Sequence, residues 1–307
     1  MKPLALSLGD PAGIGPEVAV RALAAFRPRG GALVFGDPAS VPRRWRASLK
    51  NAAWRPVAVR GWRQGRPSAA SGEAAYLSVT RAAEAVLGGE ARALVTAPLS
   101  KEAMHLAGHR WPGHTELLAH LAGRRADDVG MLLVGGGLRV FLVTRHCSLR
   151  RALSALKPAL LDKALEVCVS GLKDSLGLAH PRLALAALNP HAGEAGAFGR
   201  EEIETLGPWA RRRSRSRAYS LAGPLPADTV FVQAMRGAYD AVLCLYHDQG
   251  LIPLKLLAFD SGVNVTLGLP FLRTSPDHGT AWDLAGTGRA SPASMLEALR
   301  LADRHGR

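Results

Sequence analysis

Residues 241–250, AVLCLYHDQG, change character abruptly, because an apolar run that suits a buried strand is followed by a histidine, an aspartate and a glutamine. Short apolar runs of this kind recur along the chain and alternate with longer helical patterns. Such alternation is typical of βα units, which place their strands side by side in a largely parallel sheet. The sequence therefore predicts an α/β fold in which polar residues follow the strand ends.

The same patterns give the expected elements. We expect strands at residues 4–8, 32–36, 91–97, 138–144, 182–188, 240–246 and 263–268. We expect helices, from apolar positions at helical spacing, at residues 16–26, 72–87, 100–108, 115–123, 157–177 and 293–304. Residues 40–72 are rich in arginine and proline and show little periodicity, so we expect irregular surface structure there.

Length and composition limit the class of protein. The chain has 307 residues, 48% of them hydrophobic, which is enough for one large or two ordinary domains. Its apolar runs are broken well short of the roughly 18–20 residues that a membrane span requires. The first apolar run passes directly into a glycine-containing turn and does not resemble a secretory signal. Three widely separated cysteines indicate reduced thiols, so we expect a cytoplasmic protein without membrane contact.

A net charge of +14 makes nucleic acid a partner to consider, since basic surfaces gather phosphates. The arginines are scattered, however, apart from RRRSRSR at residues 211–217. No zinc-finger spacing or recognition helix accompanies that run. We therefore expect a solvated surface segment and no nucleic-acid partner.

Three of the expected strands are followed by a histidine: LRVFLVTRH ends at His146, RLALAALNPH at His191 and DAVLCLYH at His247. The carboxyl ends of parallel strands meet at one edge of a sheet, where ligands bind in open α/β folds. Imidazoles are good ligands for zinc and similar divalent ions, and three protein ligands leave a coordination position open. The pattern favours a metal site over three independent structural histidines.

Glycine-rich turns and helix starts suggest anion sites. SLGDPAGIGPEVAVRAL reads as strand, turn and helix, but its glycine spacing is not the dinucleotide fingerprint, and a simple tight turn remains an alternative. His114 and Thr115 come directly before a helical run, whose free N–H groups could hold a phosphate or carboxylate; an ordinary helix cap is the alternative. Lys255 and Arg273, with Asn264 between them, follow the third histidine and add cationic and amide groups suited to the same ligands.

Eight motifs together closely resemble the 4-hydroxythreonine-4-phosphate dehydrogenase family of pyridoxal phosphate biosynthesis. They are GDPAGIGPEV, TAPLSKEAM, PGHTELLA, TRH, LNPHAGE, GPLPADTVF, YHDQGLIPLK and GVNVTLGLPFLRTSPDHGTAWDLAG. The resemblance implies an isocitrate/isopropylmalate-dehydrogenase-like fold of two α/β/α domains around a cleft, not a Rossmann fold. The first domain would be discontinuous, residues 1–125 with 262–307, and the second would be residues 126–261. It also implies a homodimer whose sites combine residues of both subunits.

The resemblance assigns roles by motif. The implied metal ligands are His146, His191 and His247, with His247 completing the neighbouring protomer's site. The implied substrate-binding residues are His114, Thr115, Lys255, Asn264, Arg273 and, across the dimer, Asp228. Lys255 and Asp248 are candidate proton carriers. The candidate cofactor contacts are Gly13, Asn189, Asp277, His278 and Asp283.

The implied reaction is an NAD- and divalent-metal-dependent oxidation of 4-phosphooxy-L-threonine to 2-amino-3-oxo-4-phosphooxybutanoate, which decarboxylates to 3-amino-2-oxopropyl phosphate. NADP is the alternative cofactor, and zinc is the first choice of metal before magnesium, manganese or cobalt. Paralogues oxidise four-carbon sugar-acid phosphates, so threonate or erythronate 4-phosphate is the alternative substrate. An acyl enzyme resembling phosphate acetyltransferase is a rival interpretation, but it would not need three histidines at strand ends.

Overall fold

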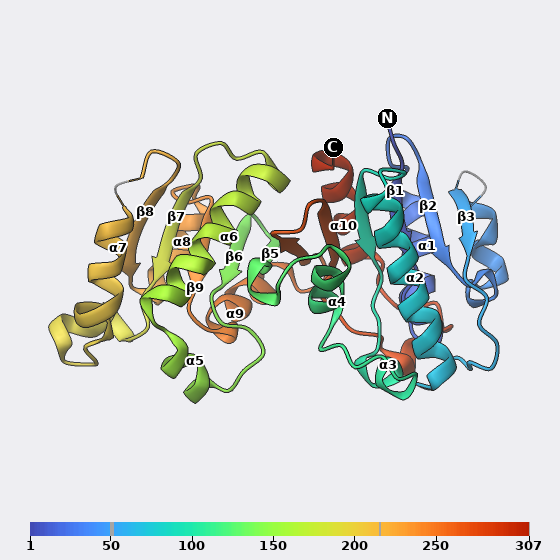
Figure 1. Ribbon diagram of the computed structural model, residues 1–307, viewed down its shortest axis with the longest axis horizontal. Helices are drawn as coiled ribbons and strands as arrows, with labels where there is room; N and C mark the ends of the chain where they lie inside the picture. Colours follow the sequence, from blue (N-terminus) through green and yellow to red (C-terminus); the bar gives the residue numbers. More distant parts are fainter. Residues whose placement is uncertain (50–51, 215, 307) are drawn as a thin grey trace. The chain divides into compact units, whose positions relative to one another are not determined.

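The computed structural model describes the chain except residues 50, 51, 215 and 307. It separates into two compact units, shown in Figure 1: Met1–Val129 with Val263–Arg307, and Gly130–Gly262. The chain thus leaves the first unit after β4 and its following helices, builds the second, and returns to complete the first. Each unit has its own hydrophobic core.

The first unit is built on a sheet with strand order β3-β2-β1-β4-β11-β10. Its strands are β1 (Leu4–Ser7), β2 (Ala32–Gly36), β3 (Ala52–Pro56), β4 (Ala93–Thr96), β10 (Val263–Leu267) and β11 (Leu272–Pro276). All of these pairs are parallel except β10–β11, which is antiparallel. Its helices are α1 (Gly15–Ala25), α2 (Ala69–Leu87), α3 (Lys101–Leu106), α4 (His114–Leu121) and α10 (Ala293–His305). Short 3-10 turns cover Pro38–Ser40, Arg43–Leu49, Ala126–Asp128 and Trp282–Leu284.

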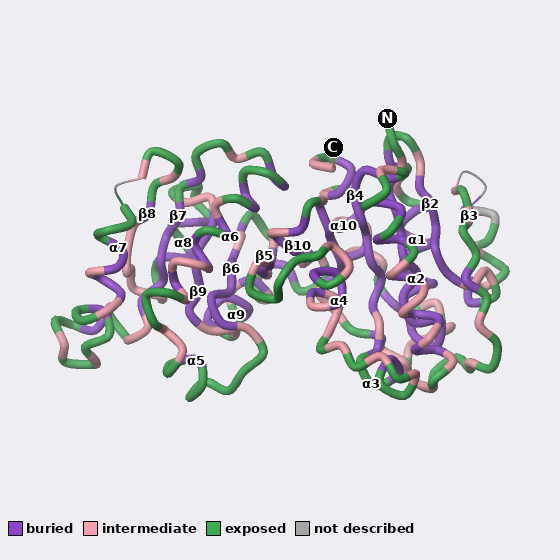
Figure 2. Tube along the Cα trace, in the orientation of Figure 1, coloured by how far each residue is buried: buried purple, intermediate pink, exposed green. Residues whose placement is uncertain are grey.

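The helices of this unit form where the sequence supplies both a cap and an apolar face. The side chain of Ser68 accepts a hydrogen bond from the amide of Ser71, and the Ser71 side chain returns one to the Ser68 amide, so α2 begins with a capping box. The alanine- and valine-rich face of α2, including Val79 and Ala82, then packs into the core. Figure 2 shows the central strands buried beneath helices that keep one exposed face.

The second unit has strand order β5-β6-β9-β7-β8. Its strands are β5 (Gly130–Gly135), β6 (Leu138–Leu142), β7 (Arg182–Ala186), β8 (Ser220–Leu225) and β9 (Ala241–Cys244). Its helices are α5 (Leu149–Ala155), α6 (Pro158–Leu176), α7 (Gly207–Arg213), α8 (Ala227–Met235) and α9 (His247–Ala258). A 3-10 segment covers Pro190–Gly196 and a π-helix covers Glu202–Leu206. Strands β5 and β6 form an antiparallel hairpin whose turn, Gly136–Gly137, has positive φ at both residues, as a tight hairpin turn requires.

The neighbouring strands β6, β9 and β7 position the three histidines. Val140 of β6 pairs with Val242 of β9, and Leu185 of β7 pairs with Leu243 of β9, in both cases in parallel. The three strands followed by histidine therefore end at one edge of the sheet, which confirms the arrangement expected from the sequence. The order of the strands in the chain does not by itself make β6, β9 and β7 neighbours in the sheet.

The seven expected strands and six expected helices are all present, with ends shifted by a few residues. The expectation for residues 40–72 was wrong in one respect, because β3 lies there and pairs in parallel with β2. The sequence pattern did not reveal β3 because it is an edge strand with little burial on either face. Among the described residues, no helix is long and apolar enough to cross a membrane.

Candidate active site

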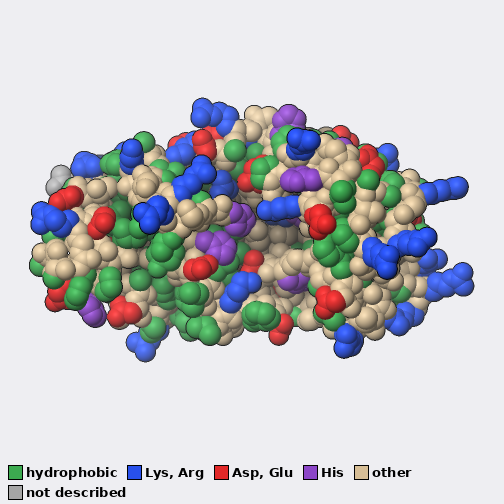
Figure 3. Space-filling model, turned by 90° about the horizontal axis from the view of Figure 1, so that it is seen from below, with side chains coloured by type: hydrophobic (Ala, Val, Ile, Leu, Met, Phe, Trp, Pro, Cys, Tyr) green, Lys and Arg blue, Asp and Glu red, His purple; other side chains and the backbone are tan. Residues whose placement is uncertain are grey.

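A cavity of about 420 Å³ lies at the carboxyl ends of β6 and β9 in the second unit. His146, which follows β6, and His247, the first residue of α9, both line it. Their ring centroids are 5.6 Å apart and the ring planes are inclined by 48°. In Figure 3, histidine side chains lie together beside carboxylates on the surface of this unit. The remaining lining residues are Thr144, Cys147, Ser148, Leu149, Ala152, Tyr246 and Asp248.

Gln249 explains the glutamine in the HDQG motif. Its Oε1 accepts a hydrogen bond of 2.6 Å from the amide of Leu245, and its Nε2 donates one of 2.7 Å to the carbonyl of Ala187. The hydroxyl of Thr144 donates to the carbonyl of Leu245 at 2.7 Å. These bonds tie the ends of β6, β7 and β9 together, so Gln249 is buried structure beneath the site and not a ligand contact.

The spacing of the His146 and His247 rings would also allow both to bind one divalent cation within a single chain, which is an alternative to the expectation that His247 completes the neighbouring protomer's site. Imidazole nitrogens about 2.0–2.1 Å from a tetrahedral zinc ion place the two ring centroids about 5 Å apart. The Nδ1 atom of His247 lies 2.6 Å from Oδ1 of Asp248, so the carboxylate can accept the Nδ1–H and leave Nε2 to bind a metal. A ligand imidazole oriented by a carboxylate is the usual arrangement in protein metal sites.

His191 lies in an unusual turn after β7. Residues 191–195 all have positive φ, and His191 itself has φ 50°. Its ring centroid is 6.2 Å from that of Phe198. Within the described part of one chain, no group of three His, Cys, Asp or Glu side chains could hold a metal ion. The expected completion of the metal site between two protomers therefore stays a prediction.

The first unit contains a buried cation without a carboxylate partner. Arg273 is 1% exposed, and its guanidinium donates to the hydroxyls of Thr96, at 2.6 Å, and Thr266, at 3.0 Å. In the described part of the chain no ion pair involves it. Burial lowers the pKa of Arg273 to about 9, and the charge of Glu116 opposes that shift. The side chain remains protonated at neutral pH, and an anion would compensate its charge.

Unsatisfied polar atoms accompany this arginine. The Nε2 of His114, at the start of α4, and the Oδ1 of Asn264, on β10, are buried without hydrogen-bond partners. Burial lowers the pKa of His114 well below its usual value, and the charges of Arg273 and Lys101 lower it further. The imidazole of His114 is suited to a polar or anionic group of a ligand, whereas Oδ1 of Asn264 would accept from a ligand's N–H or O–H. Because Thr115 also lies at the helix start, the structure brings together four of the predicted substrate-binding residues in this unit.

Two loops of the first unit meet at the predicted cofactor residues. The amide of Ile14 donates to the carbonyl of Thr280 at 2.9 Å. A Cβ placed on Gly13 would lie 2.8 Å from the same carbonyl, so only glycine allows this approach. In the second loop, Nε2 of His278 is buried without a hydrogen-bond partner, Trp282 interacts with Asp10 of the glycine turn, and Asp283 is exposed. The two loops are therefore joined through Ile14 and Thr280 and through Asp10 and Trp282, and one ring nitrogen of His278 is left unsatisfied.

A family model described as "Pyridoxal phosphate biosynthetic protein PdxA" matches residues 36–302. The chain belongs to the PdxA family. It is 44% identical to the 4-hydroxythreonine-4-phosphate dehydrogenase of Bradyrhizobium diazoefficiens, covering 99% of this chain and 96% of that protein. It is 43% identical to the D-threonate 4-phosphate dehydrogenase of Salmonella typhimurium, over 98% of both chains.

Solved structures agree with this placement. The 4-hydroxythreonine-4-phosphate dehydrogenase of Klebsiella pneumoniae is 40% identical, covers 100% of both chains and superposes with a TM-score of 0.87. An isocitrate dehydrogenase from Methylococcus capsulatus is 12% identical, with a TM-score of 0.51 over 100% of this chain and 86% of that one, which is a likeness of fold alone. The expected fold class is confirmed, and the PdxA relatives are dehydrogenases, which identifies this chain as an enzyme of that class.

Sequence reasoning missed several polar residues of this PdxA family member. Asp10, in the first glycine turn, is fully buried with one carboxylate oxygen unpartnered, and burial raises its pKa. Lys101 lies beside Gly113 at the start of α4, with Nζ 3.9 Å from where a Cβ of Gly113 would stand. Asp10 lies inside a glycine turn and Lys101 directly follows the N-cap serine of α3. Neither placement gives a distinctive sequence signal. Only the burial of Asp10 and the position of Lys101 beside Gly113 mark them in the fold.

The remaining predicted residues lie in the second unit. Lys255 extends from α9 with Nζ 5.7 Å from the ring centroid of Phe259, and Asp228 is exposed in the first turn of α8. The side-chain amide of Asn189 donates to the carboxylates of both Glu201 and Glu202, at 2.8 Å each. These hydrogen bonds hold the turn that carries His191.

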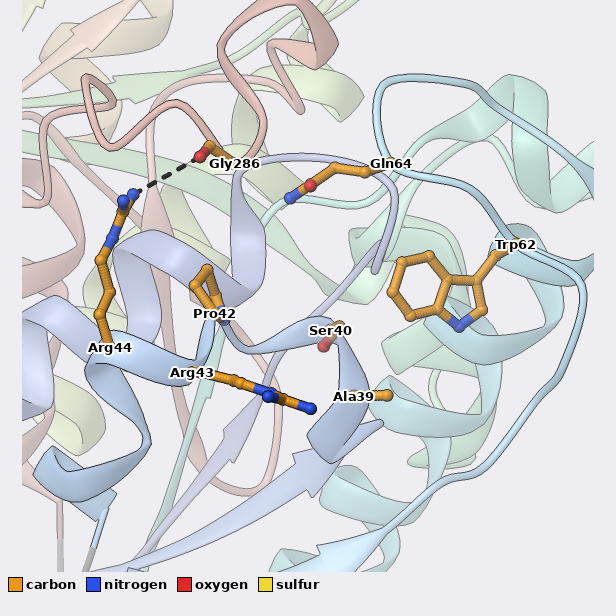
Figure 4. Close-up of a pocket in the computed structure, with 8 residues that line it drawn as sticks. All are labelled: Ala39, Ser40, Pro42, Arg43, Arg44, Trp62, Gln64 and Gly286. Carbon is orange, nitrogen blue, oxygen red and sulfur yellow. Dashed lines mark hydrogen bonds between the residues drawn. The ribbon is translucent and has the colours of Figure 1, made fainter.

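A second cavity of the PdxA fold, about 350 Å³, was not expected from the sequence (Figure 4). It lies in the first unit beside the loop that contains Gly286. Arg44 donates to the carbonyl of Gly286 at 3.5 Å, and the indole of Trp62 donates to Asp37 at 3.0 Å. Its other lining residues are Ala39, Ser40, Pro42, Arg43 and Gln64.

Proposed function

We propose that this PdxA-family chain is an NAD- and divalent-metal-dependent dehydrogenase that oxidises 4-phosphooxy-L-threonine to 2-amino-3-oxo-4-phosphooxybutanoate. This product is a β-keto acid, so it can lose carbon dioxide to give 3-amino-2-oxopropyl phosphate. The observation that carries the proposal is the buried Arg273, which makes no ion pair among the described residues, beside the incomplete His114. A phosphorylated amino acid supplies an anionic group for these two side chains and N–H or O–H groups that can donate to Oδ1 of Asn264.

The proposed metal site uses the three strand-end imidazoles. His146 and His191 follow β6 and β7, which flank β9 in the same sheet, and the third proposed ligand, His247, follows β9. We propose zinc, with the ligand set shared between two protomers and His247 completing the neighbour's site. A divalent cation bound there supplies Lewis-acid chemistry that favours ionisation of the substrate's secondary alcohol before hydride transfer.

The chain's own residues would bind and orient the substrate. Arg273, His114 and Thr115 would hold the phosphate or carboxylate, since neutral His114 can donate one hydrogen bond and the start of α4 offers free N–H groups. Asn264 would accept from an N–H or O–H of the substrate. Lys255 and, from the partner subunit, Asp228 would also contact the substrate, and Lys255 or Asp248 would take the alcohol proton. The loops that carry Gly13, Asp277, His278 and Asp283 would contact NAD, with Asn189 as a further candidate contact.

An exposed apolar surface on the second unit supports a homodimer. Ile252, Leu256 and Phe259 of the α9 region are 61%, 83% and 75% exposed. Large apolar side chains grouped in this way usually contact another protein surface. Val232 and Met235 of α8 are also exposed. We propose that a second copy of this chain covers them, and that the dimer works in the cytoplasm.

A second candidate substrate is D-threonate 4-phosphate, because relatives with that name match this chain as well as the 4-hydroxythreonine-4-phosphate dehydrogenases do. The two substrates differ at the α-carbon, where one has an amino group and the other a hydroxyl. NADH formation should be measured with both compounds and with erythronate 4-phosphate, with NAD or NADP and with added zinc, magnesium or manganese. Preference for the sugar-acid phosphate would replace the first assignment, and no reduction with any of them would overturn the proposal.

A further inference from the structure

The turn that carries His191 is held in a conformation that its residues do not favour. His191, Ala192, Glu194 and Ala195 have φ of 50°, 54°, 42° and 53°, and Gly193 has φ 86°. Left-handed backbone is routine only for glycine, so successive non-glycine residues in this region must be stabilised by their surroundings. Strained backbone of this kind is concentrated at functional sites. A neighbouring group must therefore hold the turn in this conformation.

That group is the carboxylate of Glu202, which is 5% exposed. Its Oε1 accepts hydrogen bonds from the amides of Leu188, at 2.7 Å, and Asn189, at 2.8 Å. Its Oε2 accepts a third, of 2.8 Å, from the side-chain amide of Asn189. Both oxygens thus bind the two residues that connect β7 to the turn. Three hydrogen bonds to one buried carboxylate fix this backbone strongly.

The centre of the turn also packs against the same carboxylate. A Cβ placed on Gly193 would lie 2.9 Å from Oε2 of Glu202, which is closer than a real side chain could approach. Only glycine at this position lets the turn close over the carboxylate. The direction in which His191 leaves the turn therefore depends on where Glu202 is placed.

Glu202 is itself placed by a local irregularity. It is the first residue of the π-helix Glu202–Leu206, which continues directly into α7. Leu206 and Trp209 bury this segment in the second unit, and the Trp209 indole donates to Asp162 of α6 at 2.7 Å. Single π-turns interrupting a helix are rare and occur mostly at functional sites. The π-helix, together with the buried side chains of Leu206 and Trp209, holds the Glu202 carboxylate in a fixed position.

We propose that Glu202 is the positioning residue of His191: its buried carboxylate holds the Leu188–Asn189 backbone and Gly193, and so fixes the left-handed turn that presents the His191 imidazole to a divalent cation. Glu202 does not touch the metal or the substrate. This inference rests on the metal site of the proposed function. It explains why a carboxylate, rather than an apolar residue, is buried at the start of a helix.

The test is zinc and cobalt binding to the full-length Glu202→Gln variant. The Oε1 of glutamine can still accept from the two backbone amides, but its Nε2 cannot accept from Asn189, so the substitution weakens the support without leaving a cavity. We expect zinc affinity, measured by competition with a chromophoric chelator, to fall about 10- to 100-fold. The visible absorption bands of bound cobalt should also change, which loss of general stability alone would not cause. Glu204→Gln is the control, because Glu204 lies in the same π-helix but pairs on the surface with Arg200.

The outcomes separate the two proposals. If the wild-type protein binds no zinc, or His191→Ala binds it equally well, the metal site of the proposed function fails and this inference fails with it. If the wild type binds zinc through His191 but Glu202→Gln has the same affinity and cobalt spectrum, the inference alone is overturned.

Should Glu202→Gln not fold, Gly193→Ala provides a second test, since its added Cβ would press on the carboxylate while every hydrogen-bonding group remains. The expected result is again at least a tenfold loss of zinc affinity, and unchanged affinity would contradict the inference.

Discussion

The Nδ1 atom of His247 and the Oδ1 atom of Asp248 lie 2.6 Å apart at the start of α9. Adjacent residues rarely pair in this way on a helix, because their side chains point in different directions. The pairing is possible here because His247 is the first helical residue, immediately after the extended Tyr246. The carboxylate fixes the ring and leaves Nε2 directed away from Asp248.

Asp248→Asn should weaken metal binding without removing a ligand. The amide of asparagine can accept the Nδ1–H but carries no charge, so the imidazole becomes a poorer ligand. We expect zinc affinity to fall about tenfold or more, measured by competition with a chelator. Asp260→Asn, at an exposed carboxylate after α9, is the control and should bind zinc as the wild type does.

His146→Ala should remove bound zinc from the purified protein, since His146 lines the same cavity as His247. We expect metal content, measured by mass spectrometry of the metal, to fall to a small fraction of the wild-type value. His180→Ala is the matched control, because His180 is exposed in the same unit and has no predicted role. Equal metal content in the two variants would show that His146 is not a ligand.

Arg273→Met should weaken substrate binding and raise the free energy of unfolding. Replacing a buried, unpaired charge by an apolar side chain of similar length is expected to raise the free energy of unfolding, by about 1–2 kcal/mol. Affinity for the phosphorylated substrate should fall at least tenfold, since a charge-assisted hydrogen bond contributes about 1.5–3 kcal/mol. Urea denaturation and calorimetric titration measure the two effects. Arg300→Met, at a half-exposed surface pair with Glu297, should change neither, and a binding loss equal to that of Arg273→Met would contradict the assignment.

The free energy of unfolding should decrease at low pH because of His114. Its pKa in the folded protein is lowered well below 6.5 by burial and by the charges of Arg273 and Lys101. As the pH falls below about 6.5, the unfolded chain binds a proton there and the folded chain does not, so the free energy of unfolding decreases by up to about 1.4 kcal/mol per pH unit. This contribution is absent above that pH.

His114→Asn should therefore flatten the pH dependence. Denaturant unfolding at several pH values between about 7 and 5 should show a smaller loss of stability in this variant than in the wild type. His180→Asn serves as the control, because His180 is exposed. A parallel decline in wild type and His114→Asn would mean that His114 titrates normally in the folded protein.

The exposed face of α9 should be a subunit contact. Leu256 is 83% exposed, and a glutamate there would place a charge in the proposed interface. Leu256→Glu should shift the protein from dimer to monomer in analytical ultracentrifugation and reduce metal affinity, if two protomers share the site. Leu106→Glu, at a 57% exposed leucine of the first unit, should leave the mass unchanged. A wild-type protein that sediments as a monomer would remove the shared site from the account.

Fold and site differ in how far the sequence predicts them. Strands such as β9, an unbroken apolar run, and amphipathic helices such as α6 were predictable because burial and periodicity leave a local signal. Strand β11, LRTSP, was not, because it buries an arginine, a serine and a proline that usually lie at the surface. This strand carries Arg273, the residue that we propose binds the substrate.

The histidines were predictable as candidates because each follows an apolar strand, but their geometry was not. Only the order β6-β9-β7, set by long-range pairing, shows that the three strands are neighbours. The left-handed turn at His191 depends on Glu202, which lies eleven residues later in the chain. Glu202 is buried as the first residue of a π-helix. No local pattern encodes that contact, because it exists only when the second unit is folded.

The central claim is that imidazoles at strand ends hold a divalent cation that alcohol oxidation requires. The most direct measurement is NADH formation from 4-phosphooxy-L-threonine by protein stripped of metal and then titrated with zinc. We predict no NADH from the stripped protein, recovery that saturates near one zinc ion per protomer, and no recovery in His146→Ala. Full-rate NADH formation by the stripped protein would contradict the account.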